Sequence, residues 1–429
     1  MSALFIALAC LVVGMQYYGW RRVVRDTTAR RGIARRIGTA LYIAGPVLMV
    51  GAFVSGRAGA PFWLQQVLAW PGYLWMAVSI YLTLALVAGE FVRPVLRRVL
   101  ERRAATPEPE PTVAAATVEP EPEPVLIGAD AKPPTVPERA TTEPAAPEPC
   151  TEPADPSRRL FVSRVVAGAA AAAALGTVGY GAHNVLSGPR VKNVTVPLAK
   201  LPRSAHGFRI AVVSDIHLGP ILGRAHTQRI VDTINSTQPD LIAVVGDLVD
   251  GSVENLGPAA EPLAQLRARH GSYFVTGNHE YFSGAEQWVD HVRELGLRPL
   301  ENARVEIGGF DLAGVNDIAG ENFDQGPDYD LALGDRDRAR ASVLLAHQPV
   351  MIHDAVRHGV DLQLSGHTHG GQFWPGNIIA DLANPTLAGL ERYGDTQLYV
   401  TRGAGAWGPP VRVGAPSDIT VVTLASRQA

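Results

Sequence analysis

The first hundred residues of this chain contain three apolar stretches, each close to the ~20 residues that an α-helix needs to cross the hydrocarbon core of a bilayer. They occupy residues 2–19, 37–56 and, roughly, 68–88. Tyr73 and Trp75 lie near the start of the third stretch, as aromatic residues do at a membrane–water interface. No amphipathic segment lies nearby to cover these stretches as buried core helices. We therefore predict three transmembrane helices within residues 1–103.

Arginine residues cluster on either side of these stretches and predict their orientation. Seven arginines lie between residues 21 and 36 and five between residues 93 and 103, whereas the loop between the second and third stretches contains only Arg57. Loops rich in arginine and lysine stay in the cytoplasm. We therefore expect both clusters to be cytoplasmic and the N-terminus to face outward.

Residues 104–157 differ abruptly in composition from what precedes them. They contain 14 of the 33 prolines, and 11 acidic residues against two basic ones. Such a segment cannot bury enough apolar surface to fold. We predict a disordered cytoplasmic linker, with a binding role for the tract as the alternative.

A fourth apolar stretch, rich in alanine, lies at residues 165–182 and follows Arg158 and Arg159. Paired arginines before a moderately apolar segment resemble a twin-arginine export signal, here internal, and the twin-arginine export machinery would then be a partner. The alternative is an ordinary fourth transmembrane segment with cytoplasmic arginines. Both interpretations assign residues 158–189 to this element and place residues 190–429 outside the cytoplasm.

The last part of the chain alternates short apolar runs with amphipathic segments. Strand-length runs lie at 208–214, 241–245, 272–275, 311–315, 342–346, 362–364, 398–401 and 419–424. Helices are expected at 224–237, 259–270, 285–295 and 350–358. This alternation predicts an α/β domain. The two cysteines, 140 positions apart, exclude a disulfide scaffold.

Polar side chains follow five of these predicted strands, at the point where each strand ends. They are Asp215 and His217, then Asp247, then Asn278 and His279, then His347, and finally His367 and His369. Any one of them could be a turn residue or a packed histidine. Because open α/β sheets place their sites at the carboxyl ends of strands, the ordered series predicts one shared site.

The motifs D-x-H, G-D, G-N-H-E, H and G-H-x-H, in this order, resemble those of the calcineurin-like metallophosphoesterase superfamily. The resemblance covers about residues 201–424. The sequences HTHGGQ at 367–372 and RGAGAWGPP at 402–410 are similar to the bacterial membrane-associated YkuE/YaeI-type phosphodiesterases. The resemblance implies two packed mixed β-sheets flanked by helices, with a dinuclear metal site at the strand ends.

By the same resemblance, seven residues are metal ligands. The first ion would be held by Asp215, His217 and His369, the second by Asn278, His347 and His367, and Asp247 would bridge both. Two divalent ions about 3.5–4 Å apart need such a carboxylate to offset their repulsion. Oxygen and nitrogen ligands without thiolate suit two ions of Mn, Zn or Fe. A hydroxide bridging the ions would attack phosphorus, and His279 would stabilise or protonate the leaving oxygen.

Several neighbouring residues have two interpretations. Arg402 could contact a phosphate oxygen of the substrate or form an internal ion pair, and Asp317 could support the metal shell or cap a turn. Glu280 could orient the imidazole of His279 or cap the helix that follows. Three aromatic residues beside the motif loops could line a substrate groove or pack in the core; they are Phe373, Trp374 and Trp407.

We therefore expect a multi-pass cell-membrane protein whose extracytoplasmic domain, residues 190–429, hydrolyses phosphodiester or pyrophosphate bonds. A short spacer before the first predicted strand would keep the site near the bilayer, so envelope or lipid-linked phosphate esters are the expected substrates. The alternatives are a metal-dependent nuclease and a catalytically silent receptor for a phosphorylated ligand. A net charge of −3 weighs against a nucleic-acid partner. The complete ligand set together with His279 weighs against a silent receptor.

Overall fold

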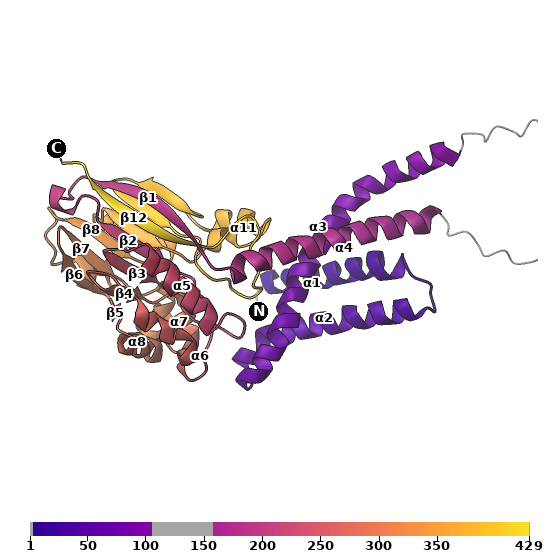
Figure 1. Ribbon diagram of the computed structural model, residues 1–429, viewed down its shortest axis with the longest axis horizontal. Helices are drawn as coiled ribbons and strands as arrows, with labels where there is room; N and C mark the ends of the chain where they lie inside the picture. Colours follow the sequence, from indigo (N-terminus) through magenta and orange to yellow (C-terminus); the bar gives the residue numbers. More distant parts are fainter. Residues whose placement is uncertain (1–2, 105–157, 429) are drawn as a thin grey trace, which may run out of the picture.

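The computed structural model describes residues 3–104 and 158–428, which form a helical region and an α/β domain (Figure 1). The helical region contains α1 (Ala3–Trp20), α2 (Ile33–Arg57), α3 (Phe62–Ala104) and α4 (Arg158–Leu186), with a π-helical turn at Arg21–Arg25. The predicted linker, except for its first residue, lies outside the described residues.

Apolar side chains cover the outside of the helical region. Among the residues that the structure describes, three helical segments are long and apolar enough to cross a membrane: α2, Phe62–Leu96 of α3 and Leu160–Leu186 of α4. α1 has 18 residues, none of them charged. Leu41 of α2 is 55% exposed and Val47 is 66% exposed. A helix that is apolar on all sides is typical of a membrane span, so the prediction of apolar N-terminal helices is confirmed.

The helices extend beyond the predicted apolar stretches. α2 begins four residues before residue 37, and α3 continues through the arginine cluster to Ala104. Arginine is a good helix former, so the helical backbone continues where the apolar composition stops. Composition therefore marks the apolar part of each helix but not its ends.

The α/β domain contains two six-stranded mixed sheets (Figure 1). The first sheet has the order β1 (Arg190–Leu198), β12 (Asp418–Ser426), β2 (Arg209–Val213), β3 (Leu241–Val245), β4 (Ser272–Val275) and β5 (Arg298–Pro299). The second has the order β10 (Gly389–Tyr393), β11 (Thr396–Val400), β9 (Leu362–Ser365), β8 (Ala341–Leu345), β7 (Phe310–Gly314) and β6 (Ala303–Ile307). Strands β2 to β5 are parallel, as are β7, β8, β9 and β11. This architecture confirms the predicted fold class.

The two sheets pack against each other through one core, in which Leu241 of β3 and Val343 of β8 are fully buried. The outer face of the first sheet is covered by α5 (Arg224–Ser236), α6 (Val253–Ala260) and α8 (Ala285–Glu294). The outer face of the second is covered by α9 (Tyr329–Leu333) and α10 (Ile352–Arg357). The remaining helices are α7 (Asn278–Ser283), α11 (Gly376–Ala383) and short 3₁₀ turns at Arg203–Ala205, Glu261–Gln265, Ile318–Phe323, Pro349–Met351 and His369–Gly371. Because both faces of the central strands are covered, these strands are continuous apolar runs in the sequence.

One prediction about local structure is wrong, and one strand was not predicted. The helix expected at 259–270 is instead the end of α6 followed by the 3₁₀ turn at Glu261–Gln265, because Pro262 has no N–H for a continuous α-helix. The spacer expected before the first strand is occupied by β1, which pairs with β12 and begins soon after α4 ends. β1 is mostly exposed at the sheet edge, so its polar residues obscure the strand pattern.

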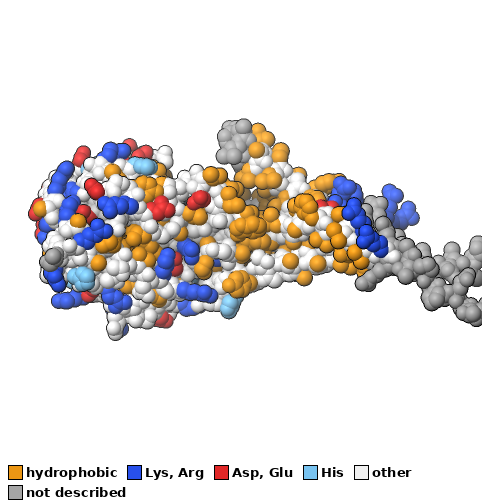
Figure 2. Space-filling view, turned by 90° about the horizontal axis from the view of Figure 1, so that it is seen from above, with side chains coloured by type: hydrophobic (Ala, Val, Ile, Leu, Met, Phe, Trp, Pro, Cys, Tyr) orange, Lys and Arg blue, Asp and Glu red, His pale blue; other side chains and the backbone are white. Residues whose placement is uncertain are grey.

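The two ends of the helical region differ in charge. Arg22, just after α1, forms an ion pair with Glu90 of α3 at 2.9 Å, and Arg164 of α4 donates a hydrogen bond to the Thr27 carbonyl at 3.1 Å. The arginine-rich segments therefore lie together. Figure 2 shows Lys and Arg side chains gathered at the end of the apolar helical region that is farthest from the α/β domain.

The opposite end of the helical region contacts the α/β domain. The hydroxyl of Tyr81 in α3 donates a hydrogen bond to the Trp374 carbonyl at 2.9 Å. The N–H of Arg412 donates to the Gly181 carbonyl of α4 at 3.1 Å. Side chains of α3 and α4 also pack with Val411 in a small apolar cluster. These contacts attach the domain to the helices at the end away from the arginine clusters.

Candidate metal centre

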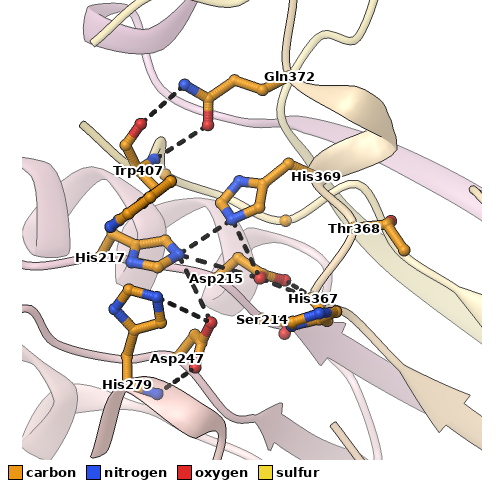
Figure 3. A network of polar contacts seen from close by, with 12 residues as sticks. Ser214, Asp215, His217, Asp247, His279, His367, Thr368, His369, Gln372 and Trp407 are labelled. Atoms are coloured by element: carbon orange, nitrogen blue, oxygen red, sulfur yellow. Dashed lines mark hydrogen bonds and ion pairs between the residues drawn. The ribbon is translucent and has the colours of Figure 1, made fainter. Parts of the chain in front are cut away.

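Loops that follow five strands meet at one edge of the sheets and bring the seven predicted metal ligands together. Figure 3 labels Asp215, His217, Asp247, His367 and His369 among them. Asp215 and His217 follow β2, Asp247 follows β3, Asn278 follows β4, His347 follows β8, and His367 and His369 follow β9. The convergence follows from topology, since parallel strands bring their carboxyl ends to the same edge of a sheet.

Backbone strain is concentrated in these loops. Five of the seven residues have φ between 50° and 71°, namely Asp215, His217, Asp247, His367 and His369. Non-glycine residues in this region cost roughly 1–3 kcal/mol each, and such strain is found at functional sites. The glycines next to them allow close approach, because a Cβ on Gly277 would lie 2.3 Å from Oδ1 of Asp247.

The first group of ligands is formed by Asp215, His217 and His369, which could hold one metal ion. Nε2 of His217 lies 3.0 Å from Nε2 of His369, and Oδ1 of Asp215 lies 3.3 Å from the same His369 nitrogen. Two imidazole nitrogens and a carboxylate oxygen directed at one point are the donor set of a divalent transition metal.

The second group is formed by Asp247, His347 and His367, with Asn278 beside it. Nε2 of His347 lies 3.2 Å from Oδ2 of Asp247, and Oδ1 of Asn278 lies 3.0 Å from Nδ1 of His367. This contact of His347 lacks hydrogen-bond geometry, so among the residues described Nε2 of His347 is buried without a hydrogen-bond partner. A buried nitrogen left in this way fits a metal ligand.

Burial and nearby charges keep two of the imidazoles in the neutral form that binds metal. Burial and the charge of His347 lower the pKa of His367 to about 4. Burial and the charges of His217 and Arg412 lower the pKa of His369 well below its ordinary value. Burial also acts to lower the pKa of His347, but Asp247 outweighs it and raises that pKa. A metal ion bound there would replace the proton of His347.

Asp250 is a site residue that the sequence analysis missed. Its Oδ1 accepts hydrogen bonds from Nδ1 of His279 at 2.6 Å and from Nδ1 of His217 at 3.1 Å. Burial acts to lower the pKa of His279, but the hydrogen bond and charge of Asp250 raise it to about 9. The signal was available, because Asp250 lies three residues after Asp247 in the same loop. The carboxylate fixes the ring of His279 with Nε2 3.9 Å from Oδ2 of Asp247.

Glu280 caps backbone rather than orienting the neighbouring histidine. Its carboxylate accepts hydrogen bonds from the N–H groups of Gly277 at 2.6 Å, Leu248 at 2.7 Å and Asp247 at 3.0 Å. These bonds cap α7 and join the loops after β3 and β4. Burial and the nearby Asp247 raise the pKa of Glu280 to about 7.

Arg412 is a second residue that the sequence analysis missed, and it carries no motif that could have revealed it. Its buried guanidinium donates hydrogen bonds to the carbonyls of Gly405 at 2.6 Å and His369 at 3.1 Å, and its Nη2 lies 3.1 Å from Nδ1 of His369. Arg412 therefore holds His369 in place from behind.

Arg402 and Asp317 lie in different surroundings. Arg402 is partly buried next to Gly370, and it forms no ion pair with the residues that the structure describes. Its predicted contact with phosphate stays a prediction. Asp317 accepts hydrogen bonds from the Ala319 N–H at 2.8 Å and from Gln348 at 2.9 Å, which is the turn-capping alternative.

A cavity of about 440 Å³ opens beside the centre, and His217, Asp250 and His279 line it. Of the three aromatic residues with two interpretations, Trp407 lines this cavity, with its ring 5.8 Å from that of His279. Phe373 packs against helices α3 and α4, and Trp374 is 53% exposed next to α3.

Comparison with known proteins agrees with the ligand set described above. Residues 208–371 match the family model described as calcineurin-like phosphoesterase, a range that includes all seven predicted ligands. The chain is 40% identical over 259 residues to a transmembrane protein with metallophosphoesterase domain from Danio rerio, covering 57% of this chain and 59% of that protein. This chain therefore spans less than two thirds of the Danio rerio protein.

This chain covers a larger share of two bacterial relatives than of the Danio rerio protein. An uncharacterized metallophosphoesterase of Helicobacter pylori strain J99 is 38% identical over 272 residues, covering 63% of this chain and 73% of the relative. The uncharacterized metallophosphoesterase YkuE of Bacillus subtilis is 30% identical over 284 residues, covering 63% of this chain and 98% of the relative. The similarity therefore extends over nearly the whole of one relative.

Proposed function

The chain belongs to the calcineurin-like metallophosphoesterase family of metal-dependent phosphoric ester hydrolases, and from this premise we propose that it is a membrane-anchored, dinuclear-metal phosphoesterase. Its reaction is hydrolysis of phosphodiester or pyrophosphate bonds in envelope or lipid-linked substrates. Its catalytic domain lies on the extracytoplasmic side of the cell membrane.

The position of Asp247 is the observation that carries the proposal. Its Oδ2 lies 3.2 Å from Nε2 of His347 in one ligand group and 3.8 Å from Nε2 of His217 in the other. A carboxylate placed between the two groups of candidate ligands supports a bridge between two cations. The first ion would be held by Asp215, His217 and His369 and the second by Asn278, His347 and His367.

The remaining chemistry follows from the bound ions and from His279. When bound, two divalent ions of Mn, Zn or Fe supply the Lewis acidity that activates water and offsets charge on the phosphoryl oxygens. His279 holds a proton near the site and donates it to the leaving oxygen. Asp250 orients the ring and stabilises its charged form through the 2.6 Å hydrogen bond. Arg402 contributes a positive charge for a phosphate oxygen.

The charge distribution supports the proposed orientation in the membrane. The arginine-rich segments lie at one end of the helical region, and the α/β domain contacts the other end. Because arginine-rich loops stay in the cytoplasm, this arrangement favours an extracytoplasmic catalytic domain. An export role for Arg158 and Arg159, with the twin-arginine machinery as partner, stays a prediction beside that of an ordinary transmembrane segment.

Helix α11 supports a position of the domain against the bilayer. Its side chains Ile378, Ile379 and Leu382 are 54%, 73% and 85% exposed, and the helix follows Trp374, which bonds to α3. A helix with exposed apolar residues beside transmembrane segments is typical of one that lies in the membrane interface. This arrangement favours lipid-linked substrates. A nuclease is less supported, because Arg57 is the single Lys or Arg among the described residues that line the cavity.

A hydrolysis screen of the purified full-length chain tests this function. Phosphomonoesters, phosphodiesters, nucleoside diphosphate conjugates and phospholipids would each be offered with Mn²⁺, Zn²⁺ or Fe²⁺. We expect metal-dependent hydrolysis of a phosphodiester or a pyrophosphate that is abolished in the Asp247→Asn variant. Cleavage of DNA at a higher kcat/KM would favour the nuclease, and the absence of all turnover would favour the silent receptor.

A further inference from the structure

The cavity beside the metal centre has walls from both regions of the molecule. His217, Asp250 and His279 line it on the side of the α/β domain. On the other side it is lined by the end of α2, the turn that follows and the start of α3, within residues 52–65, and by Tyr73 of α3. We refer to the lining residues of this segment as the turn between α2 and α3. Membrane helices and candidate catalytic residues therefore face the same space.

An aromatic series connects the candidate proton donor with the membrane helices. The ring centroid of Trp407 lies 5.8 Å from that of His279 and 6.3 Å from that of Phe53, and Phe53 lies 4.9 Å from Tyr73. The Gln372 side chain holds the backbone of Trp407 through hydrogen bonds of 2.9 and 3.0 Å. The Trp407 side chain is 46% exposed, so a fixed apolar surface leads from the site toward α2 and α3.

A single positive charge lies at the far wall of the cavity. Arg57 is exposed at the end of α2, and the one hydrogen bond of its side chain within the described part of the chain is to the Phe53 carbonyl at 3.3 Å. Asp250, the one acidic residue among the described lining residues, is already bonded to two histidines. The charge of Arg57 is therefore available to an anion in the cavity.

We propose that the turn between α2 and α3 is part of the active site and binds the non-reacting part of a membrane lipid that carries a phosphodiester or diphosphate head group. This proposal rests on the proposed function, because the scissile phosphate lies at the metal centre. Arg57 binds a second anionic group of the head, and Phe53, Tyr73 and Trp407 contact the first carbons of the lipid chain. The chain then leaves the cavity along α2 and α3, within the bilayer.

The turn would act on lipid substrates through binding and orientation. Contacts to a remote part of a substrate lower the barrier by holding the reacting group in place. A small soluble ester occupies the metal centre without reaching Arg57 or Phe53. Substitutions in the turn should therefore separate the two kinds of substrate, which substitutions of metal ligands cannot do.

The test compares a long-chain prenyl diphosphate in detergent–lipid micelles with soluble bis(p-nitrophenyl) phosphate, using the full-length protein and Mn²⁺. In the first reaction water adds to the terminal phosphorus and the bridging P–O bond breaks, giving inorganic phosphate and prenyl monophosphate, whose leaving oxygen takes up a proton. The variants are Arg57→Gln and Phe53→Ala. Their matched controls are Arg190→Gln, at the exposed start of β1, and Phe91→Ala, which is 77% exposed on α3 and not part of the wall of this cavity.

We expect Arg57→Gln to lower kcat/KM for the prenyl diphosphate about tenfold or more, as loss of a charged hydrogen bond does. Phe53→Ala should act in the same direction, while both controls and all rates on the soluble diester stay within about twofold. The proposal would be overturned, while the proposed function stands, if the two variants lost kcat/KM equally on both substrates. It would also be overturned if they hydrolysed the lipid as well as the controls do. A wild-type protein that hydrolyses the soluble diester but no lipid would also overturn it. A wild-type protein that hydrolyses neither substrate overturns the proposed function itself.

Discussion

The helical region and the α/β domain use apolar side chains in opposite ways. Ile43 and Val47 of α2 are 64% and 66% exposed, whereas Leu241 and Val244 of β3 are fully buried. Exposed apolar side chains like the first pair suit a bilayer, while water forces the burial of the second pair. The comparison shows that a whole-chain composition of 47% hydrophobic and 18% charged residues describes neither region. Each region has the amino acids that its own solvent requires.

The two regions also differ in where they place charge. In the helical region the arginines lie together at one end, as in the ion pair of Arg22 with Glu90. In the α/β domain the titratable groups of the candidate metal centre are buried at the strand ends, where Asp215 and His347 are fully buried. Arginine clusters of the first kind are typical of cytoplasmic loops, and buried charged groups of the second kind are typical of functional sites.

The largest expected difference concerns which segments of the chain a protease can reach from outside the cell. The arginine clusters should hold residues 104–157 in the cytoplasm. A protease added to intact, wall-stripped cells should cut after residue 190 or not at all, and it should cut the linker only after the cells are permeabilised. Cleavage of the linker from outside intact cells would reverse the orientation proposed for both regions.

His279→Ala should lower the rate on an alkyl phosphodiester by roughly 10²–10⁴, the usual contribution of general acid–base catalysis. The bound metals should stay, and a nitrophenyl ester should be less affected because its leaving group departs without a proton. Asn278→Ala is the matched control, since loss of a ligand should slow both substrates and respond to excess metal. Equal slowing of both substrates by His279→Ala would mean that His279 does not donate the proton.

Asp250→Asn should lower the rate on the alkyl phosphodiester by a smaller factor, roughly 10–100, which is typical of residues that orient the groups that contact metal or substrate. Because Asp250 bonds to His279 as well as to His217, the part of its effect that depends on His279 should disappear in a His279→Ala background. The measurement is the kcat of both single variants and the double variant. Fully additive losses would show that Asp250 acts independently of His279.

The smallest effect concerns stability and compares two leucines directly. Leu241→Ala, in the core between the sheets, should lower the free energy of unfolding of the α/β domain by ~2–5 kcal/mol. Leu41→Ala, 55% exposed on α2, should leave it unchanged, because a lipid-facing leucine packs against nothing in that domain. Thermal inactivation of the full-length protein in detergent would measure both. A similar loss for Leu41→Ala would contradict the lipid-facing assignment.

Much of the site could be predicted from the sequence because its residues directly follow buried strands. Asp215 and Asp247 stand next to apolar runs, so a local pattern and the rule for parallel sheets were enough to place them together. Arg412 could not be found in this way, since it reaches His369 from a loop without a recognisable motif. Asp250 could have been found, because it shares a loop with Asp247.

The contact between the two regions was beyond sequence reasoning for a different reason. Phe53 and Trp407 come from opposite ends of the chain, and each belongs to a segment with its own local explanation. No periodicity within either segment carries information about the other. Likewise, β1 is an edge strand whose polar, exposed residues resemble a spacer, and its pairing with β12 depends on the complete sheet.

The metal content of Asp247→Asn tests the central claim most directly. The substitution removes the charge that offsets two adjacent cations and leaves the other six predicted ligands in place. Metal analysis of the purified full-length proteins should give about two ions per chain for the wild type and one or none for the variant, with hydrolysis lost in parallel. Two tightly bound ions and near-normal hydrolysis in Asp247→Asn would contradict a dinuclear centre bridged by this residue.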